Sequence, residues 1–299
     1  MMPFVSISQL DEKMKIFVLA LLLSPLVCQT DAVASDRYDG WQLVWSDEFN
    51  RDGRPDTAVW NYEHGFVRNN EDQWYQSDNA WQADGKLIIE ARRERKPNPG
   101  YEAGSNDWRS KREYIEYTSA SLNTAGKIDF LYGRLEVRAR IPVGDGAWPA
   151  IWTLGSGMEW PSCGEIDIME CYSVDGEPSL LANAAWGRDH RFDAEWDSSH
   201  TPLSHFLAKD KDWTSKFHVW RMDWDETAIN LYLDDELLNS VPLSKTINGT
   251  IGNHTNPFTK PQYVLLNLAL GGDNGGKVDA SAMPMRYEID YVRIYRKVK

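Results

Sequence analysis

The sequence predicts an all-β fold, a sandwich or jelly roll, and three observations support this prediction. Short runs of alternating apolar and polar residues recur along the chain, separated by turn residues such as Gly, Asn and Asp. No segment keeps the 3.6-residue period of an amphipathic helix. A chain of 299 residues is long enough for one large β domain, and it shows no internal repeat. We therefore predict a single domain over residues 35–299.

A signal peptide over residues 1–34 is predicted to precede this domain. Lys15 is followed by an apolar run, Ile16–Val27, and the letters DAVAS then place Ala32 and Ala34 at small-residue cleavage positions. The acidic pair ahead of this segment is unusual for a signal peptide, so Met14 is an alternative start. The apolar run is shorter than the roughly 20 residues that a transmembrane helix requires, which argues against a membrane anchor.

The signal peptide predicts a secreted protein, in the periplasm, at the cell surface or outside the cell, without a membrane span. A lipid anchor on Cys28 is an alternative, although the Leu26 and Val27 pair before it lacks the small residue that lipoprotein processing favours. We expect the mature protein to be a monomer.

Within the predicted domain, six alternating runs are assigned as strands, at residues 86–93, 133–142, 218–224, 229–238, 263–270 and 287–295. Two stretches rich in Gly, Asn and Pro are assigned as long loops, residues 96–113 and 244–261. The second loop contains the glycosylation sequons NGT and NHT, a pattern that often arises by chance.

The charge and the tryptophan content limit the class of partner. A net charge of −13 at pH 7 argues against nucleic acid and other anionic polymers, because like charges repel, and a neutral polymer fits better. The chain has 14 tryptophans, more than a core needs, since each buried indole N–H requires a partner. Flat rings stack against the C–H faces of sugars, so this excess favours a cleft that holds a polysaccharide.

The stretch CGEIDIMEC places three carboxylates, Glu165, Asp167 and Glu170, among apolar residues that are typical of a buried strand. Side chains alternate along a regular strand, so Glu165 and Asp167 share one face and Glu170 falls on the other. One residue extruded as a β-bulge near Met169 would bring all three acids to the same face. The pattern therefore predicts a bulged strand with an acidic site on one face.

Cys163 and Cys171 flank this strand, and the strand assignment predicts that they are free thiols. Eight residues of extended chain separate their Cα atoms by about 26 Å at ~3.3 Å per residue. A disulfide requires Cα atoms within about 7 Å.

Carboxylates in this arrangement suit the hydrolysis of a glycosidic bond. One carboxylic acid protonates the leaving oxygen, and a second carboxylate about 5–5.5 Å away attacks the anomeric carbon, which retains its configuration. Glu165 and Glu170 fit this pair. Asp167 between them would raise the proton affinity of a neighbouring Glu, and a hydrogen bond from it would hold Glu165 in position.

The sequence resembles glycoside hydrolase family 16, in the branch whose active strand carries the bulge. The motif GEIDIME carries the resemblance together with LVWSDEFN, NNEDQWYQSDNAWQADGKLIIEAR, YTSASLNTAGKIDFLYGRLEVRARIPVGDGAWPAIWTLG and EIDYVRIY. The motifs stand in the family's order and cover residues 40 to 297. The resemblance implies a concanavalin A-like jelly roll of two curved antiparallel sheets, with an open cleft on the concave face.

By resemblance, Glu165 is the nucleophile, Glu170 the general acid/base and Asp167 the assisting carboxylate, and no cofactor is needed for catalysis. The residues expected to bind substrate are Asn69, Arg134, Glu136, Trp148, Trp152 and Trp186. For Arg134 and Glu136, which share a face of their strand, an ordinary solvated strand face is the alternative.

A structural calcium ion on the convex side is also implied by the resemblance. The expected ligands are Glu48, Asp290 and the backbone carbonyl of Gly85. Carboxylate and carbonyl oxygens are the ligands that Ca²⁺ prefers.

The chain departs from the family pattern near the expected cleft. Relatives that cleave laminarin tend to carry Thr-x-His-Trp where this chain has Asn183, Ala184, Ala185 and Trp186. A methyl group therefore replaces an imidazole, which leaves room or removes a hydrogen bond. The following segment, residues 188–206, is expanded relative to compact members, and loops at a cleft rim set the substrate.

The sequence thus predicts a secreted endo-acting retaining β-glycanase acting on a β-1,3- or mixed β-1,3/1,4-glucan. An endo-β-galactanase or galactosidase-type activity on algal or host glycans is the alternative within the enzyme class. A jelly-roll carbohydrate-binding module without turnover is the alternative of another class, but it would have no use for a desolvated cluster of carboxylates.

Overall fold

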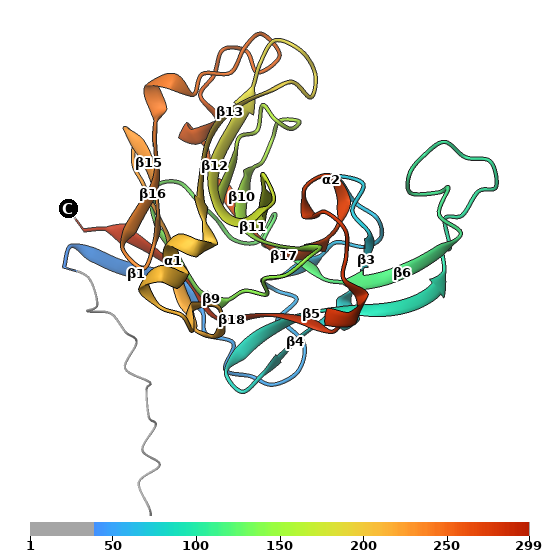
Figure 1. The fold of residues 1–299 in the computed structure, drawn as a ribbon. Coiled ribbons are helices and arrows are strands. Elements are labelled where there is room, and N and C mark those ends of the chain that lie inside the picture. The colour runs from blue at the N-terminus through green and yellow to red at the C-terminus, as the bar shows by residue number, and fades with distance from the viewer. Residues whose placement is uncertain (1–38, 299) are drawn as a thin grey trace, which may run out of the picture. The chain divides into compact units, whose positions relative to one another are not determined.

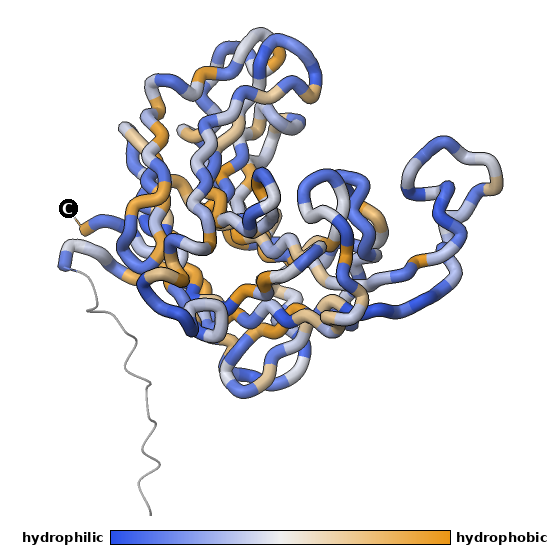
Figure 2. Tube along the Cα trace, in the orientation of Figure 1, coloured by the Kyte–Doolittle hydropathy of each residue, from blue (hydrophilic) through white to orange (hydrophobic). Residues whose placement is uncertain are grey.

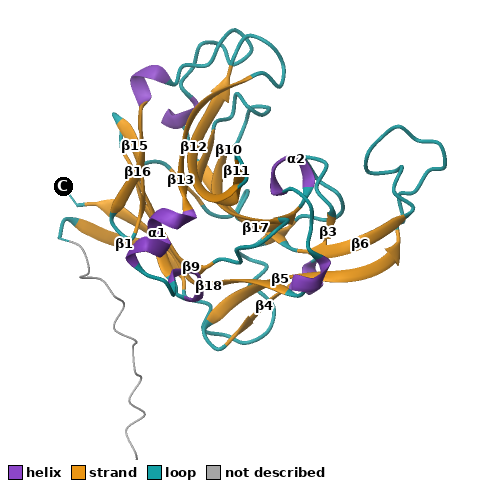
Figure 3. Ribbon diagram, in the orientation of Figure 1, coloured by secondary structure: helices purple, strands orange, loops and turns teal. Residues whose placement is uncertain are grey.

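The computed structural model describes residues 39–298, and in this part of the chain the strands form two large sheets (Figure 1). Helices are few and short, as Figure 3 shows. The predicted all-β fold is confirmed. The predicted signal peptide, with Cys28, lies outside the described residues. No helix within 39–298 is long and apolar enough to cross a membrane.

The first sheet has ten strands within the described range and runs in the order β16, β15, β14, β9, β18, β5, β6 and β3, with β1 beside β18 and β4 beside β5. Their bounds are β1 (Trp41–Asp47), β3 (Gln73–Tyr75), β4 (Ala80–Ala83), β5 (Lys86–Pro97), β6 (Tyr114–Ser119), β9 (Gly133–Arg140), β14 (His218–Trp224), β15 (Ala228–Leu233), β16 (Glu236–Pro242) and β18 (Met285–Lys297).

The second sheet has eight strands in the same part of the chain and runs in the order β13, β12, β11, β10, β17, β7 and β2, with β8 beside β17. Their bounds are β2 (Asn61–Tyr62), β7 (Ser121–Asn123), β8 (Asp129–Phe130), β10 (Ala147–Gly155), β11 (Glu165–Val174), β12 (Glu177–Gly187), β13 (Ala194–Pro202) and β17 (Gln262–Leu270). The α-helices are α1 (Leu203–Lys209) and α2 (Gly272–Gly275), and the 3₁₀ helices are η1 (Ser77–Asn79), η2 (Trp213–Ser215), η3 (Leu243–Lys245), η4 (Pro257–Thr259) and η5 (Ala280–Ala282).

The hydrophobic core lies between the two sheets, and alternation within each strand builds it. In β9, Leu135, Val137 and Ala139 are fully buried in the core. In β11, Ile166 and Ile168 are equally buried and belong to the same core. Figure 2 shows hydrophobic stretches along the paired strands and hydrophilic outlying loops. Each sheet therefore keeps its other face free for polar side chains, as sandwich packing requires.

The boundaries of the predicted elements differ from the structure mainly at turns. The run 229–238 is not one strand, because Asp234 and Asp235 adopt positive φ and turn the chain between β15 and β16. The predicted loop 96–113 begins two residues later, because β5 extends to Pro97. Residues 98–113 form a loop that projects from the β5–β6 pair (Figure 1).

Cys163 and Cys171 are both buried and free, which confirms the prediction made from their separation along the strand. Burial raises the pKa of each thiol, to about 11 for Cys163 and about 12 for Cys171. Both therefore remain protonated at neutral pH and act as small apolar groups in the packing.

Candidate active site

The predicted β-bulge is present in β11, at Ile168 and Met169. On the β10 side, Ile151 pairs with Met169 and the next residue, Trp152, pairs with Asp167, so Ile168 has no partner there. The register with β12 shifts at the same place, between Asp167 and Glu170. Ile168 and Met169 are both fully buried in the core. Two consecutive residues thus face inward, and Glu170 returns to the face that carries Glu165 and Asp167.

A glycine sets the start of this strand. Gly164 precedes Glu165 and has φ +81°, a conformation that residues with a Cβ rarely adopt. A Cβ at this position would also lie 2.8 Å from the side chain of Pro257. Glycine therefore allows the chain to turn into β11 directly at the first catalytic candidate.

The register across the second sheet aligns the three acids with neighbours on both sides, in three rows. The rows consist of Leu154, Glu165, Ala185 and Trp196; of Trp152, Asp167, Asn183 and Ser198; and of Ala150, Glu170, Leu181 and His200. All twelve of these side chains except Ala185 line one cleft of about 760 Å³. The sheet therefore presents a continuous floor on which the acids lie in the middle strand.

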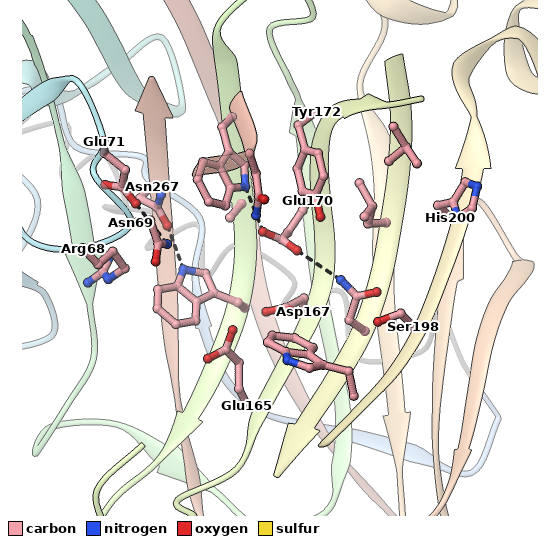
Figure 4. A pocket seen from close by; sticks show the side chains of 18 of the residues that line it. Arg68, Asn69, Glu71, Glu165, Asp167, Glu170, Tyr172, Ser198, His200 and Asn267 are labelled. Atoms are coloured by element: carbon pink, nitrogen blue, oxygen red, sulfur yellow. Dashed lines mark hydrogen bonds between the residues drawn. The ribbon is translucent and has the colours of Figure 1, made fainter. Parts of the chain in front are cut away.

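Figure 4 shows how the cleft extends to both sides of the acids. Asn69, Glu71 and Asn267 lie on one side, and Ser198 and His200 lie on the other. A chain-like ligand can therefore cross the sheet over β11 and contact the protein on both sides of the acids.

Hydrogen bonds hold the two glutamates in place. The indole Nε1 of Trp160 donates to Oε2 of Glu165 at 2.6 Å. Glu170 accepts from Trp148 Nε1 to its Oε1 at 2.8 Å and from Asn183 Nδ2 to its Oε2 at 3.1 Å (Figure 4). Both carboxyl groups are thus oriented by N–H groups, which can only donate hydrogen bonds. The carboxyl oxygens keep further lone pairs with which they can contact a ligand in the cleft.

Burial gives the three acids high proton affinities. It raises the pKa of Glu170 to about 7, although the hydrogen bonds from Trp148 and Asn183 act in the opposite direction. It also raises the pKa of Glu165, against the hydrogen bonds from Trp160 and Asp167. The pKa of Asp167 is raised well above its usual range, first by burial and then by the charges of Glu165 and Glu170. Asp167 therefore binds its proton more tightly in the folded chain than in the unfolded one.

The raised proton affinity of Asp167 predicts how the Asp167→Asn variant changes the stability of the folded chain. In the folded chain the acid stays protonated at pH values where the unfolded chain releases its proton, so native stability falls as pH rises above about 3.8. Asn removes this loss. We expect the variant to melt a few degrees above the wild type at pH 8, at about 2–4 °C for each kcal/mol, and near the wild type at pH 4. Differential scanning calorimetry at both pH values tests this.

The exposed Asp175→Asn variant, in the turn between β11 and β12, is the matched control and should show no such pH-dependent gain. Equal melting of Asp167→Asn and wild type at pH 8 would contradict the protonated state of Asp167. Activity of Asp167→Asn should fall because Asn cannot exchange a proton with Glu165.

A fourth carboxyl group, Glu71, lines the cleft on the Asn69 side and is 2% exposed. Burial raises its pKa to about 7, against the opposing charge of Arg68. Gln73 Nε2 donates to Glu71 Oε2 at 2.6 Å, and Asn69 Nδ2 lies 3.4 Å from Oε1. Glu71 therefore helps to orient the Asn69 side chain.

The same side of the cleft holds Trp152 in a fixed orientation. Its Nε1 donates to Asn267 Oδ1 at 2.7 Å, and Asn267 Nδ2 donates to the Tyr75 hydroxyl at 3.1 Å. The Arg68 guanidinium lies 5.1 Å from the centre of the Trp152 ring. The indole is therefore presented to the cleft in one orientation.

Of the residues predicted to bind substrate, the structure places Asn69, Trp148 and Trp152 in the cleft. Asn69 has φ +55°, which asparagine tolerates, and its side chain lines the cleft. These three residues keep their predicted position.

The prediction for Arg134 and Glu136 is wrong. Both lie in β9, in the ten-stranded sheet, while the cleft is formed by the eight-stranded sheet. Arg134 is engaged in two hydrogen bonds to Asp223, at 2.6 and 2.9 Å. Alternation along β9 correctly separates these polar residues from the core, but it does not reveal which of the two sheets carries the cleft.

The prediction for Trp186 is also wrong. Trp186 follows Ala185, which pairs with Glu165, so its side chain points to the opposite face of β12. It is 7% exposed and belongs to the hydrophobic core. Trp186 therefore supports the strand from behind and does not line the cleft.

The residues predicted to hold calcium have other partners in the structure. Glu48 accepts hydrogen bonds from Arg293 at 2.8 and 2.7 Å, and Asp290 accepts one from Arg138. Gly85 lies in the turn between β4 and β5. Within residues 39–298 no group of three or more His, Cys, Asp or Glu could hold a metal ion. Both carboxylates of the predicted set are thus held by arginines in this structure.

Calcium binding at these residues stays a prediction. It would require Glu48 and Asp290 to leave their arginine partners. If it occurs, a chelator should lower the melting temperature, while activity measured well below melting should change little. An unchanged melting temperature in the presence of chelator would contradict it.

Several cleft residues were not predicted from the sequence. Among them are Arg68, Glu71, Leu154, Trp160, Tyr172, Leu181, Trp196, Ser198, His200 and Asn267. Trp160 precedes Glu165 by only five residues, and a turn lies between them. This short separation could have suggested that the Trp160 side chain contacts Glu165. For the residues of β13, the sequence analysis showed only that the segment 188–206 is expanded relative to compact family members. It did not assign individual residues of this strand to the cleft.

The fold and the site together define a class of enzyme. Two glutamates that are oriented by hydrogen-bond donors, with a buried aspartate between them, lie in a cleft of a β-sandwich with tryptophans along it. This is the arrangement that hydrolysis of a glycosidic bond requires. The protein is a glycoside hydrolase.

Comparison with known proteins identifies the family. The model of glycosyl hydrolases family 16 matches residues 68–293. The β-glucanase of Rhodothermus marinus is 35% identical over 305 residues, which cover 95% of this chain and 94% of that protein. The chain therefore belongs to glycosyl hydrolases family 16.

Two solved structures resemble the fold closely. One is the laminarinase catalytic domain from Thermotoga maritima MSB8, with a TM-score of 0.69 and 32% identity over 87% of this chain and 99% of that one. The other is described with endo-acting O-glycanases that members of the human gut microbiota express to initiate mucin breakdown. It has a TM-score of 0.75 and 34% identity over 87% of this chain and 92% of that one.

Proposed function

We propose that this protein is a secreted, retaining, endo-acting β-glycanase that cleaves internal linkages of a β-1,3- or mixed β-1,3/1,4-glucan. The observation that carries the proposal is the bulged strand β11, which directs Glu165, Asp167 and Glu170 into one open cleft. The similarity to the Rhodothermus marinus β-glucanase and the Thermotoga maritima laminarinase supports the glucan as substrate. The predicted signal peptide supports secretion.

In the first step, the Glu165 carboxylate attacks the anomeric carbon of the sugar above it while the bond from that carbon to the bridging oxygen breaks. Glu170 gives its proton to this oxygen, and the first part of the chain leaves as an alcohol. The product is a glycosyl ester on Glu165. The pKa of Glu170, raised to about 7 by burial, keeps this group protonated below neutral pH.

In the second step, Glu170 is a carboxylate and takes a proton from water. The water oxygen attacks the anomeric carbon, the ester bond to Glu165 breaks, and both glutamates return to their starting states. Two inversions give net retention. A sugar hydroxyl in place of water would give transglycosylation through the same intermediate.

The neighbours of the acids stabilise the charges that change. Trp160 Nε1 donates to Glu165 and stabilises its carboxylate as the ester bond breaks. Trp148 and Asn183 hold both oxygens of Glu170 and fix the direction of proton transfer. Asp167, protonated between the two glutamates, lowers the repulsion that two carboxylates would have.

The open cleft supports cleavage within a chain. Cleft residues continue on both sides of the acids, from Asn69 and Asn267 to Ser198 and His200. A polymer can therefore lie across the sheet without presenting an end.

A second candidate is endo-cleavage of a galactose-containing host glycan. Asn183 and Ala185 stand where laminarin-cleaving relatives tend to carry Thr and His, and Asn183 contacts the acid Glu170 directly. The structural similarity to the protein described with mucin-acting O-glycanases supports this candidate. It uses the same two-step chemistry on a different sugar.

The polymer is identified by incubating the protein with laminarin, barley β-glucan, lichenan, agarose, galactan and mucin glycans. The released oligosaccharides are then identified by mass spectrometry. The proposal expects internal cleavage products from laminarin or barley β-glucan. Release from mucin glycans or galactan alone would favour the second candidate, and release from none of the six would contradict both.

A further inference from the structure

Trp196 is the most exposed tryptophan in residues 39–298, at 43%. It lines the cleft from β13, the edge strand of the eight-stranded sheet. No hydrogen bond of its indole and no ring contact occurs among the described residues. A large apolar ring that is left bare inside a substrate cleft indicates a surface that a ligand covers.

The position of Trp196 relative to the acids follows from the register. Trp196 pairs with Ala185 on β12, and Ala185 pairs with Glu165 on β11. Adjacent strands lie about 4.8 Å apart, so the backbones at Trp196 and Glu165 are separated by about 10 Å. Only the methyl group of Ala185, which is fully buried, stands in this row between them. No long side chain therefore separates Glu165 from Trp196 within this row.

Two further polar side chains share this face of β13. Ser198 pairs with Asn183 and His200 pairs with Leu181, and both line the cleft. Figure 4 shows them on the side opposite to Asn69 and Glu71. The cleft face of β13 thus presents one flat aromatic ring and two hydrogen-bonding side chains to a ligand in the cleft.

The opposite face of β13 fixes the strand to the rest of the fold. Asn239 Nδ2, from β16, donates to Asp197 Oδ1 at 3.1 Å and to the carbonyl of Ala182 at 2.9 Å. Ser199 Oγ donates to the carbonyl of Leu238 at 2.8 Å. These contacts connect the edges of the two sheets and hold β13 in one orientation.

The end of β13 is anchored as well. Helix α1 follows directly, and its Leu203 and Phe206 are buried in the hydrophobic core. The face that carries Trp196 is therefore preorganised, and a ligand would not have to order it on binding.

We propose that the cleft face of β13, formed by Trp196, Ser198 and His200, is a sugar-binding site of the catalytic cleft, with Trp196 as its stacking surface. It binds a pyranose unit of the polymer on the β13 side of the cleaved linkage. The indole covers the C–H face of this unit, and Ser198 and His200 face its hydroxyl groups. The inference rests on the proposed glycanase function and assigns a specificity-determining role within it.

A contact of this kind binds the substrate equally in the ground state and the transition state. Its loss should therefore raise KM and leave kcat near the wild-type value. The effect should depend on chain length, because a short oligosaccharide that does not reach β13 makes no contact there.

The experiment compares Trp196→Ala with wild type on an oligosaccharide series from whichever polymer the panel shows to be cleaved. We expect KM for long oligosaccharides to rise about tenfold and kcat to change less than twofold, a change that corresponds to about 1.4 kcal/mol of binding. The shortest substrates should show equal kcat/KM in the two proteins. Trp196→Phe, which keeps a flat ring, should recover most of the affinity.

Two controls separate binding from folding. Phe192→Ala removes another exposed aromatic ring, 56% exposed, from a turn outside the cleft, and it should leave KM unchanged. Melting temperatures of both alanine variants should match the wild type, because neither ring is part of the core. A binding measurement by isothermal titration calorimetry on Glu165→Gln and on Glu165→Gln with Trp196→Ala should show the same tenfold difference.

Unchanged KM and unchanged binding in Trp196→Ala, with a polymer that is cleaved, would overturn this inference and leave the proposed function intact. If none of the six polymers is cleaved or bound, the proposed function fails first. A fall in kcat with constant KM would assign Trp196 to the chemical step and would also overturn the inference.

Discussion

Replacing Glu165 with Gln is expected to lower kcat by a factor on the order of 10⁴–10⁶, the range found when an enzymatic nucleophile is removed. The amide has nearly the same shape and its carbonyl oxygen can still accept the hydrogen bond that Trp160 donates. It has no charge with which to attack the anomeric carbon, so the glycosyl ester cannot form. Steady-state kinetics on the cleaved polymer gives kcat, and calorimetry should show that oligosaccharide binding is retained.

The control for this prediction is Glu177→Gln, an exposed glutamate at the start of β12, which should keep wild-type kcat. Nuclear magnetic resonance of the first product tests the same assignment in the wild type. The anomeric configuration of the new reducing end should match that of the cleaved linkage. Inversion, or near wild-type turnover of Glu165→Gln, would show that Glu165 is not the nucleophile.

Replacing Glu170 with Gln is expected to lower kcat by about 10²–10⁴ on polymer substrates, because the leaving oxygen loses its proton donor. The loss should be much smaller in the first step for an aryl glycoside whose phenolate leaves without a proton. Single-turnover release of the phenol measures that step directly. Equal losses on the polymer and on the aryl glycoside would contradict the role of Glu170 as acid.

The pH profile tests the same group in the wild type. Burial raises the pKa of Glu170 to about 7, so the acid is lost, and kcat/KM should fall, as pH rises through about 7. On the acid side Glu165 must be ionised, and burial raises its pKa above the usual 4.5, so activity should also fall as pH decreases. The profile should therefore be bell-shaped, and Glu170→Gln should lack the alkaline limb.

Asn183 offers a matched test of the alkaline limb. Its Nδ2 donates to Glu170 Oε2 and lowers the pKa of that carboxyl group. In Asn183→Ala the alkaline limb should move to higher pH, while the acid limb stays in place. A shift of the alkaline limb to lower pH would contradict the assignment of this limb to Glu170.

Local sequence patterns were sufficient to predict several of the strands, including the catalytic strand. In β11, the order of acidic and apolar residues is compatible with a buried strand only if one residue is extruded, and the structure has this bulge at Ile168 and Met169. The free state of Cys163 and Cys171 follows from the same strand. These features depend on alternation within a few residues, which the sequence displays directly.

Features that depend on pairing between distant segments could not be predicted in the same way. Alternation shows that Arg134 and Glu136 share a face, but only the topology places β9 in the sheet that does not form the cleft. Trp186 was assigned to the cleft by resemblance, but its neighbour Ala185 pairs with Glu165, and adjacent residues face opposite sides of a strand. Trp196 enters the cleft because β13 pairs with β12, which no local pattern in residues 188–206 indicates.

The two-for-one pairing in β11 also shortens the distance along the strand. Five steps of chain lead from Glu165 to Glu170, but on β12 their partners Ala185 and Leu181 are only four steps apart. Glu165 and Glu170 therefore lie about 3.3 Å nearer to each other along the strand than they would in a strand of the same sequence without a bulge. A chain that lacks Met169 would keep all three acids on one side with a continuous ladder, whereas loss of Ile166 would turn Glu165 inward. We therefore expect the fold of this site to tolerate the loss of one residue after Asp167 but not between Glu165 and Asp167.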